Sequence, residues 1–170
     1  KQHAFLEKLA KFKPASHIFM VDGTSGNDEG VTKLIELMGN RGSLFYRSPV
    51  AGMNKGLCGL IARDDTLIIK VNSQWDERGG TNTDLLKSLI KAIVEHPDGF
   101  VGEIVVADNG QAQYGSTGRG GSFDYSQNNA EDTSQSVQRM VDSFAGYTVS
   151  THLWDNITTV RVKEYSEGDV

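Results

Sequence analysis

Residues 66–72 read Thr-Leu-Ile-Ile-Lys-Val-Asn, and this stretch decides the fold of the chain. The three consecutive apolar residues from Leu67 to Ile69 are typical of a strand buried on both faces, as in a parallel sheet covered by helices. After a polar loop, residues 84–95 place apolar side chains on one stripe of a helix and polar side chains on the other. The apolar run Ile104–Ala107 then closes a strand–helix–strand unit, a connection that is nearly always parallel and right-handed.

Further elements extend this unit toward both ends of the chain. Residues 158–165 alternate apolar and charged side chains, which indicates a half-buried strand. We predict an α/β fold: a mostly parallel open sheet with helices on both faces, right-handed crossovers, and one antiparallel or edge strand near the C-terminus. The other predicted elements are helices over residues 1–12 and Val31–Met38, a helix that opens at Glu131–Thr133, strands over His17–Val21, Leu44–Tyr46 and Tyr147–Leu153, and irregular structure over residues 48–59.

The length of the chain suits one α/β domain over residues 1–170. Because the sequence begins with Lys1 rather than Met, we expect it to be part of a longer or processed chain. The expected compartment is the cytoplasm or, where a signal peptide has been removed, an extracytoplasmic space.

The composition argues against several classes of partner and cofactor. A formal net charge of −5 disfavours nucleic-acid binding, and no apolar run is long enough to span a membrane. Cys58 is the single cysteine, so the chain carries no iron–sulfur motif. The partners that remain are a small-molecule ligand or other protein subunits, including copies of the same chain in a homo-oligomer.

The candidate catalytic residues are Lys70 and Asp108, which stand where two neighbouring strands end. In open α/β sheets, ligands bind beyond the carboxyl ends of the strands. A lysine at the end of a buried strand is partly desolvated, and it can act as a base or as an anchor for an anion. The alternative is a structural salt bridge between Lys70 and a neighbouring carboxylate such as Asp108.

Polar residues around the same strand ends form the candidate ligand site. The open amides at the helix start suit a carboxylate or a phosphate, although the same residue types are common helix caps. Asn72 also has two possible roles, since it can orient a ligand or cap the loop. The candidate ligand-binding residues are Asn72, Thr81, Asn82, Thr83, Asp84 and Asn109.

Carboxylates at the strand ends also suggest a metal site. Asp76, Asp108 and Asp155 follow or end predicted strands, and carboxylate oxygens are the ligands that a hard divalent cation prefers. A divalent cation is therefore the cofactor that the sequence suggests.

Three motifs within residues 66–110 resemble the family catalogued as domain of unknown function 362. They are Leu67–Asn72, Thr81–Leu86 and Ile104–Gly110, which match a strand ending in Lys-x-Asn, a Thr-rich helix start, and a strand ending in an acidic residue with Gly nearby. The resemblance implies an α/β domain of prokaryotic type that is longer than this chain. Many relatives carry ferredoxin-like cysteine motifs, which implies redox or cofactor-related chemistry, but this chain has no such motif.

Two functional hypotheses follow. In the first, the domain binds an anionic small molecule or a hard metal ion at the strand ends, with Lys70 neutralising the anion. In the second, the chain is a non-catalytic structural or assembly subunit. Its N-terminal helix and the Gly-rich loop at residues 115–129 would then contact other proteins.

Overall fold

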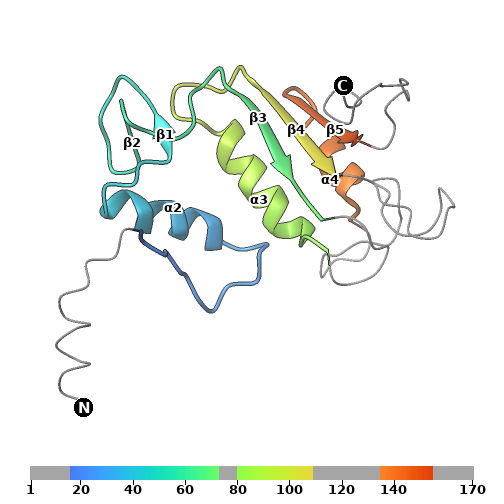
Figure 1. Cartoon of the computed structure of the whole chain (residues 1–170), viewed down its shortest axis with the longest axis horizontal. Coiled ribbons are helices and arrows are strands. Elements are labelled where there is room, and N and C mark those ends of the chain that lie inside the picture. The colour runs from blue at the N-terminus through green and yellow to red at the C-terminus, as the bar shows by residue number, and fades with distance from the viewer. Residues whose placement is uncertain (1–15, 73–79, 109–134, 155–170) are drawn as a thin grey trace, which may run out of the picture.

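The structure is a computed structural model, and it describes residues 16–72, 80–108 and 135–154. From β3 onward, strands and helices alternate along the chain, as in α/β proteins (Figure 1). In chain order the elements are α2 (Gly30–Asn40), β1 (Tyr46–Arg47), β2 (Lys55–Gly56), β3 (Thr66–Lys70), α3 (Thr83–Val94), β4 (Glu103–Asp108), α4 (Val137–Asp142) and β5 (Thr148–Leu153).

The centre of the fold is a three-stranded parallel sheet in the order β3-β4-β5. Leu67 pairs with Ile104, and Ile104 pairs with Val149 on its other side. Helix α3 connects β3 to β4, and α4 precedes β5, so two strand–helix–strand units share the middle strand. The predicted α/β class with an open parallel sheet is therefore confirmed.

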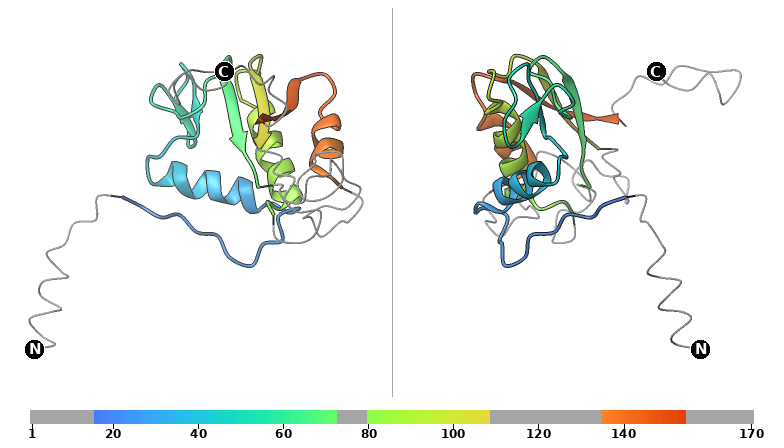
Figure 2. Two further views of the ribbon diagram at one scale, coloured as in Figure 1. Left: turned by 45° about the vertical axis from the view of Figure 1, so that its right-hand side comes forward. Right: turned by 90° about the vertical axis from the view of Figure 1, so that its left-hand side faces the viewer.

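The two faces of this sheet have different environments. Side chains alternate between the faces of a strand, and Ile104 and Val106 are fully buried in the core beneath α3 and α4. Ile68 points to the opposite face, where its side chain is 67% exposed. Helices α3 and α4 contact each other and lie on the same side of the sheet (Figure 2). Within the described residues, these two helices thus cover one face of the sheet. The sequence instead predicts helices on both faces and a strand β3 that is buried on both sides.

Helix α3 forms where the sequence predicts it and packs its apolar stripe into the core. Asn82 caps it, since its side-chain oxygen accepts a hydrogen bond of 2.9 Å from the amide of Leu85. Ile90 and Ile93 project from the buried stripe of the helix into the core. Burial of such side chains, at about 1.5–3 kcal/mol each, holds the helix on the sheet.

A second, two-stranded parallel sheet packs beside α3. Tyr46 of β1 pairs with Lys55 of β2, and the Tyr46 hydroxyl donates a hydrogen bond of 2.9 Å to the carbonyl of Ala92 in α3. The predicted helix over Val31–Met38 is confirmed as α2. Residues 48–59 are not wholly irregular, because they contain β2.

Some predicted elements differ from the structure or fall beyond its described part. The strand predicted over His17–Val21 is wrong: the segment has no regular secondary structure and pairs with none of the described strands, and Ile18 is 95% exposed. The predicted N-terminal helix, the Gly-rich loop and the strand over residues 158–165 lie outside the described residues. No helix in the described ranges has the length and apolar character that crossing a membrane requires.

Candidate functional site

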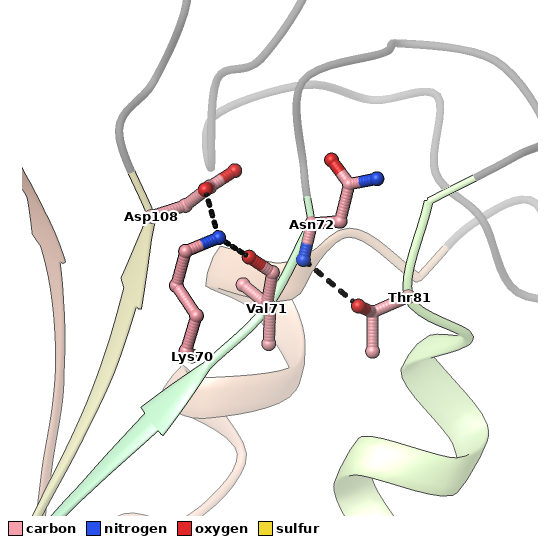
Figure 3. A network of polar contacts seen from close by, with 5 residues as sticks. All are labelled: Lys70, Val71, Asn72, Thr81 and Asp108. Carbon is pink, nitrogen blue, oxygen red and sulfur yellow. Dashed lines mark hydrogen bonds and ion pairs between the residues drawn. The ribbon is translucent and has the colours of Figure 1, made fainter.

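Strands β3 and β4 end side by side, and this brings Lys70 and Asp108 together. Lys70 is the last residue of β3, and Asp108 is the last residue of β4. The register pairs Lys70 with Ala107, so Asp108 stands one residue beyond Lys70 at the same edge of the sheet (Figure 3). The parallel arrangement therefore accounts for the meeting of two residues that lie far apart in the sequence.

The two side chains form an ion pair of unequal burial. Lys70 Nζ lies 2.7 Å from Asp108 Oδ1, a short charge-assisted hydrogen bond. The side chain of Asp108 is 6% exposed, whereas that of Lys70 is 51% exposed. Lys70 Nζ also donates a hydrogen bond to the backbone carbonyl of Val71. The ammonium is thus held in place on one side by a buried carboxylate and a carbonyl, and it meets solvent on the other.

Trp154 adds an aromatic ring to this group, and the sequence analysis did not assign it to the site. It follows β5 directly, at the same sheet edge as Lys70 and Asp108. This position at the end of a predicted strand is the sequence feature that could have identified it. Lys70 Nζ lies 6.0 Å from the centroid of the indole ring, within the range of a cation–π contact. Trp154 is 36% exposed, so part of the ring meets solvent beside the ammonium.

Asn72 and Thr81 close the loop between β3 and α3. The Asn72 amide donates to Thr81 Oγ1 at 2.9 Å, and the Thr81 amide donates to the Asn72 carbonyl at 2.8 Å. The Asn72 carboxamide takes part in neither bond and points away from Thr81, past the end of β3 (Figure 3). The backbone of Asn72 therefore caps the loop, as one reading predicts, while its side chain is left for other contacts.

The next three residues of the predicted ligand site have structural contacts of their own. Asn82 uses its side chain as the α3 cap. Thr83 is fully buried, and its hydroxyl donates to the Gln135 carbonyl at 3.3 Å. Asp84 is 6% exposed and accepts a hydrogen bond of 2.7 Å from Gln135 Nε2. Gln135, which the sequence analysis did not single out, links the start of α3 to the start of α4.

The predicted metal site receives no support from the described residues. Among them, no group of three or more His, Cys, Asp or Glu side chains is arranged to hold a metal ion. Of the three predicted ligands, Asp76 and Asp155 lie outside the described residues, as does the predicted ligand-binding residue Asn109. The third ligand, Asp108, already has the Lys70 ammonium at 2.7 Å.

Two titratable groups away from the strand ends have shifted pKa values. Burial, reinforced by the negative charge of Glu95, raises the pKa of Tyr46. The pKa of Asp28 is lowered, chiefly because its carboxylate accepts hydrogen bonds from the backbone amides of Ser25 and Gly30. Asp28 therefore keeps its negative charge into the acid range.

A comparison of the chain with protein-family models, curated proteins and solved structures finds no match. The resemblance to domain of unknown function 362 therefore stays a prediction, and the site is interpreted from its own geometry.

Proposed function

We propose that this chain binds a small anionic molecule at the carboxyl ends of β3 and β4. In this proposal, Lys70 is the anchor that neutralises the anion, Asp108 positions Lys70, and the Asn72 carboxamide orients the ligand. The observation that carries the proposal is the half-exposed ammonium of Lys70, held by a carboxylate that is almost fully buried.

The burial of Asp108 explains why a paired lysine can still attract an anion. Its carboxylate lies inside the protein, whereas part of the Lys70 ammonium faces solvent, so the positive end of the pair is the one that a ligand meets. An ammonium has three N–H bonds, and the contacts with Asp108 and Val71 use two of them. The third N–H can donate to a carboxylate or phosphate oxygen.

A metal ion is the weaker candidate for this position. It would have to bind Asp108 next to the Lys70 ammonium, and two positive charges at such a distance repel each other. The catalytic role predicted for Lys70 and Asp108 would require one of them to exchange a proton with the bound ligand, a step additional to binding.

The partly exposed ring of Trp154 supports a ligand with a flat apolar part. Such a ligand would place its anionic group at Lys70 and stack its flat part against the indole, which combines two kinds of contact at one sheet edge. The site would then favour a planar carboxylate over inorganic phosphate.

Isothermal titration calorimetry tests the proposal with benzoate, acetate and inorganic phosphate as probes. We expect Lys70→Met to weaken binding of these anions about tenfold, the loss that corresponds to one charge-assisted contact of about 1.4 kcal/mol. Lys91→Met is the matched control, because Lys91 is an exposed lysine that lies 3.8 Å from a glutamate and is outside the site. Equal binding by wild type and Lys70→Met would refute the proposal.

The alternative, a non-catalytic assembly subunit, is favoured by the exposed apolar side chain of Ile68, on the sheet face opposite α3 and α4. If that face joins two copies of the chain, Ile68→Thr lowers the mass measured by light scattering at a fixed concentration. Val101→Thr changes an equally exposed valine outside the strands and serves as the control. A mass that is monomeric for the wild type would exclude this homo-oligomer.

A further inference from the structure

A groove between α2 and α3 lies apart from the contacts of Lys70 and has a different charge. Its volume is about 520 Å³, and its apolar lining includes Val31 of α2 and Ala92 of α3. Asp84, in the first turn of α3, forms part of its wall. The groove therefore offers a ligand both an apolar surface and a carboxylate.

The carboxylate of Asp84 has hydrogen-bonding capacity that the described contacts do not use. Oδ1 accepts the bond from Gln135, but Oδ2 is buried and has no hydrogen-bond partner within the described part of the chain. Buried carboxylate oxygens are normally paired, because desolvation without a donor is costly. An oxygen in this state favours the arrival of an N–H donor, above all a positively charged one.

We propose that the groove between α2 and α3 binds a cationic amine, with the ammonium donating a hydrogen bond to Asp84 Oδ2 and the hydrocarbon part lying in the groove between the two helices. This site is separate from the anion site at the strand ends, and either can exist without the other.

The charges around the groove favour a cation. Its lining carries four carboxylates and two ammonium groups, which gives a formal net charge of −2. Two of the four carboxylates have partners at 3.8 Å, since Glu95 pairs with Lys91 and Glu29 pairs with Lys33. What remains is Asp28 and Asp84 against Lys87, still a net negative charge. The lowered pKa of Asp28 keeps that carboxylate ionised.

The loop before α2 disfavours the binding of an anion at the N-terminus of α3. Gly26 adopts a positive φ of 87°, and a Cβ at this position would lie 3.3 Å from Asn82 Oδ1 and 3.4 Å from the Leu85 amide. The loop therefore sits directly over the start of the helix, and Ser88 Oγ secures it by donating to the Gly26 carbonyl at 2.8 Å. The Leu85 amide is already taken by Asn82, so the amide capacity that attracts anions to a helix start is reduced here.

The shape around Asp84 Oδ2 also limits the kind of amine. The oxygen has almost no surface of its own, so a donor reaches it only when the carboxylate turns toward the groove, and a slim donor needs the least room. A primary ammonium meets this requirement and supplies N–H donors. A quaternary ammonium is bulky and has no N–H, so it does not satisfy the oxygen.

Nuclear magnetic resonance titration of the whole chain tests the proposal, with n-butylammonium as the probe and tetramethylammonium as the comparison. We expect n-butylammonium to shift the backbone amide signals of Gly26, Asp84 and Ser88, and tetramethylammonium to leave them in place. Asp84→Asn should weaken n-butylammonium binding at least about tenfold, the usual scale for loss of one charged hydrogen bond.

The matched control is Asp142→Asn. Asp142 accepts a hydrogen bond of 2.8 Å from Gln138 Nε2, as Asp84 does from Gln135, but it is exposed and does not line the groove. This variant should bind n-butylammonium like the wild type. The proposal is overturned if Asp84→Asn binds as tightly as wild type or if the wild type binds both probes equally. The comparison of the two probes uses only the wild type, so it tests the proposal even if Asp84→Asn fails to fold.

Discussion

Lys70 and Asp108 are separated by 38 residues in the sequence, yet Lys70 Nζ lies 2.7 Å from Asp108 Oδ1. The contact spans two neighbouring parallel strands whose register places Lys70 opposite Ala107. Asp108 is buried, whereas half of the Lys70 side chain meets solvent. Because of this unequal burial, the two partners should respond differently to substitution.

Lys70→Met should destabilise the protein more than Asp108→Asn. Removal of the lysine takes an ammonium away from a buried carboxylate, and we expect the free energy of unfolding to fall by about 2 kcal/mol. Asp108→Asn leaves an ammonium that can turn to solvent, so its expected cost is about 1 kcal/mol. Urea unfolding measures both values.

The double variant Lys70→Met/Asp108→Asn completes this comparison. It removes the buried charge as well as the ammonium, so it should be more stable than Lys70→Met alone. If Asp108→Asn lowers the free energy of unfolding more than Lys70→Met does, the unequal burial of the two side chains does not determine their contributions to stability.

The raised pKa of Tyr46 predicts a loss of stability in alkaline solution. The unfolded chain releases this proton near the ordinary value of 10.0, while burial and Glu95 keep the folded-state pKa higher. The folded state then binds more protons, so the stability contribution is complete below pH 10.0 and is lost as the pH rises through the folded-state pKa. Unfolding at several pH values from neutral to alkaline measures this slope.

Tyr46→Phe should flatten that slope, although it also removes the hydrogen bond to Ala92 and lowers stability at neutral pH. Tyr147→Phe is the control, because Tyr147 is 45% exposed and makes no such bond in the described structure. If the loss of stability with rising pH is unchanged in Tyr46→Phe, groups other than Tyr46 cause it.

Gly59 should not tolerate alanine. A Cβ at this position would overlap the backbone carbonyl group of Tyr46, which cannot move without disturbing β1. We expect Gly59→Ala to cost about 2–3 kcal/mol, in the range of other overpacking substitutions. Gly52→Ala would meet only the flexible side chain of Lys55, and thermal unfolding should find it close to wild type.

Trp154 should report on anion binding through its fluorescence. The chain has two Trp residues, so Trp75→Phe leaves Trp154 as the single emitter. Because Lys70 Nζ lies 6.0 Å from its ring centroid, an anion that joins Lys70 should change the Trp154 emission. The same titration of Lys70→Met/Trp75→Phe should give no change, and a persistent signal would indicate binding elsewhere.

The sequence predicts the parts of the fold that depend on local pattern. The helical period that ends at Val94 and the apolar run from Ile104 identify α3 and β4, and their order predicts the parallel sheet. The same logic brings Lys70 and Asp108 to one edge, because each is the last residue of its strand.

Features that depend on distant partners were not predictable in this way. The apolar triplet around Ile68 suggests full burial, but β3 lies at the edge of the described sheet and the Ile68 side chain is 67% exposed. The segment His17–Val21 has the residue types of a strand, but none of the described strands pairs with it. The bond between Gln135 and Asp84 joins residues 51 positions apart and has no local signal.

The most direct test of the anion site is to follow the side-chain nitrogen of Lys70 by nuclear magnetic resonance in ¹⁵N-lysine protein as benzoate is added. We expect the Lys70 Nζ signal to move to saturation, together with the Asn72 side-chain amide, while the signal of Lys91 stays in place. A Lys70 signal that remains fixed while the ligand saturates the protein would rule out Lys70 as the anchor, because the anion would then bind elsewhere.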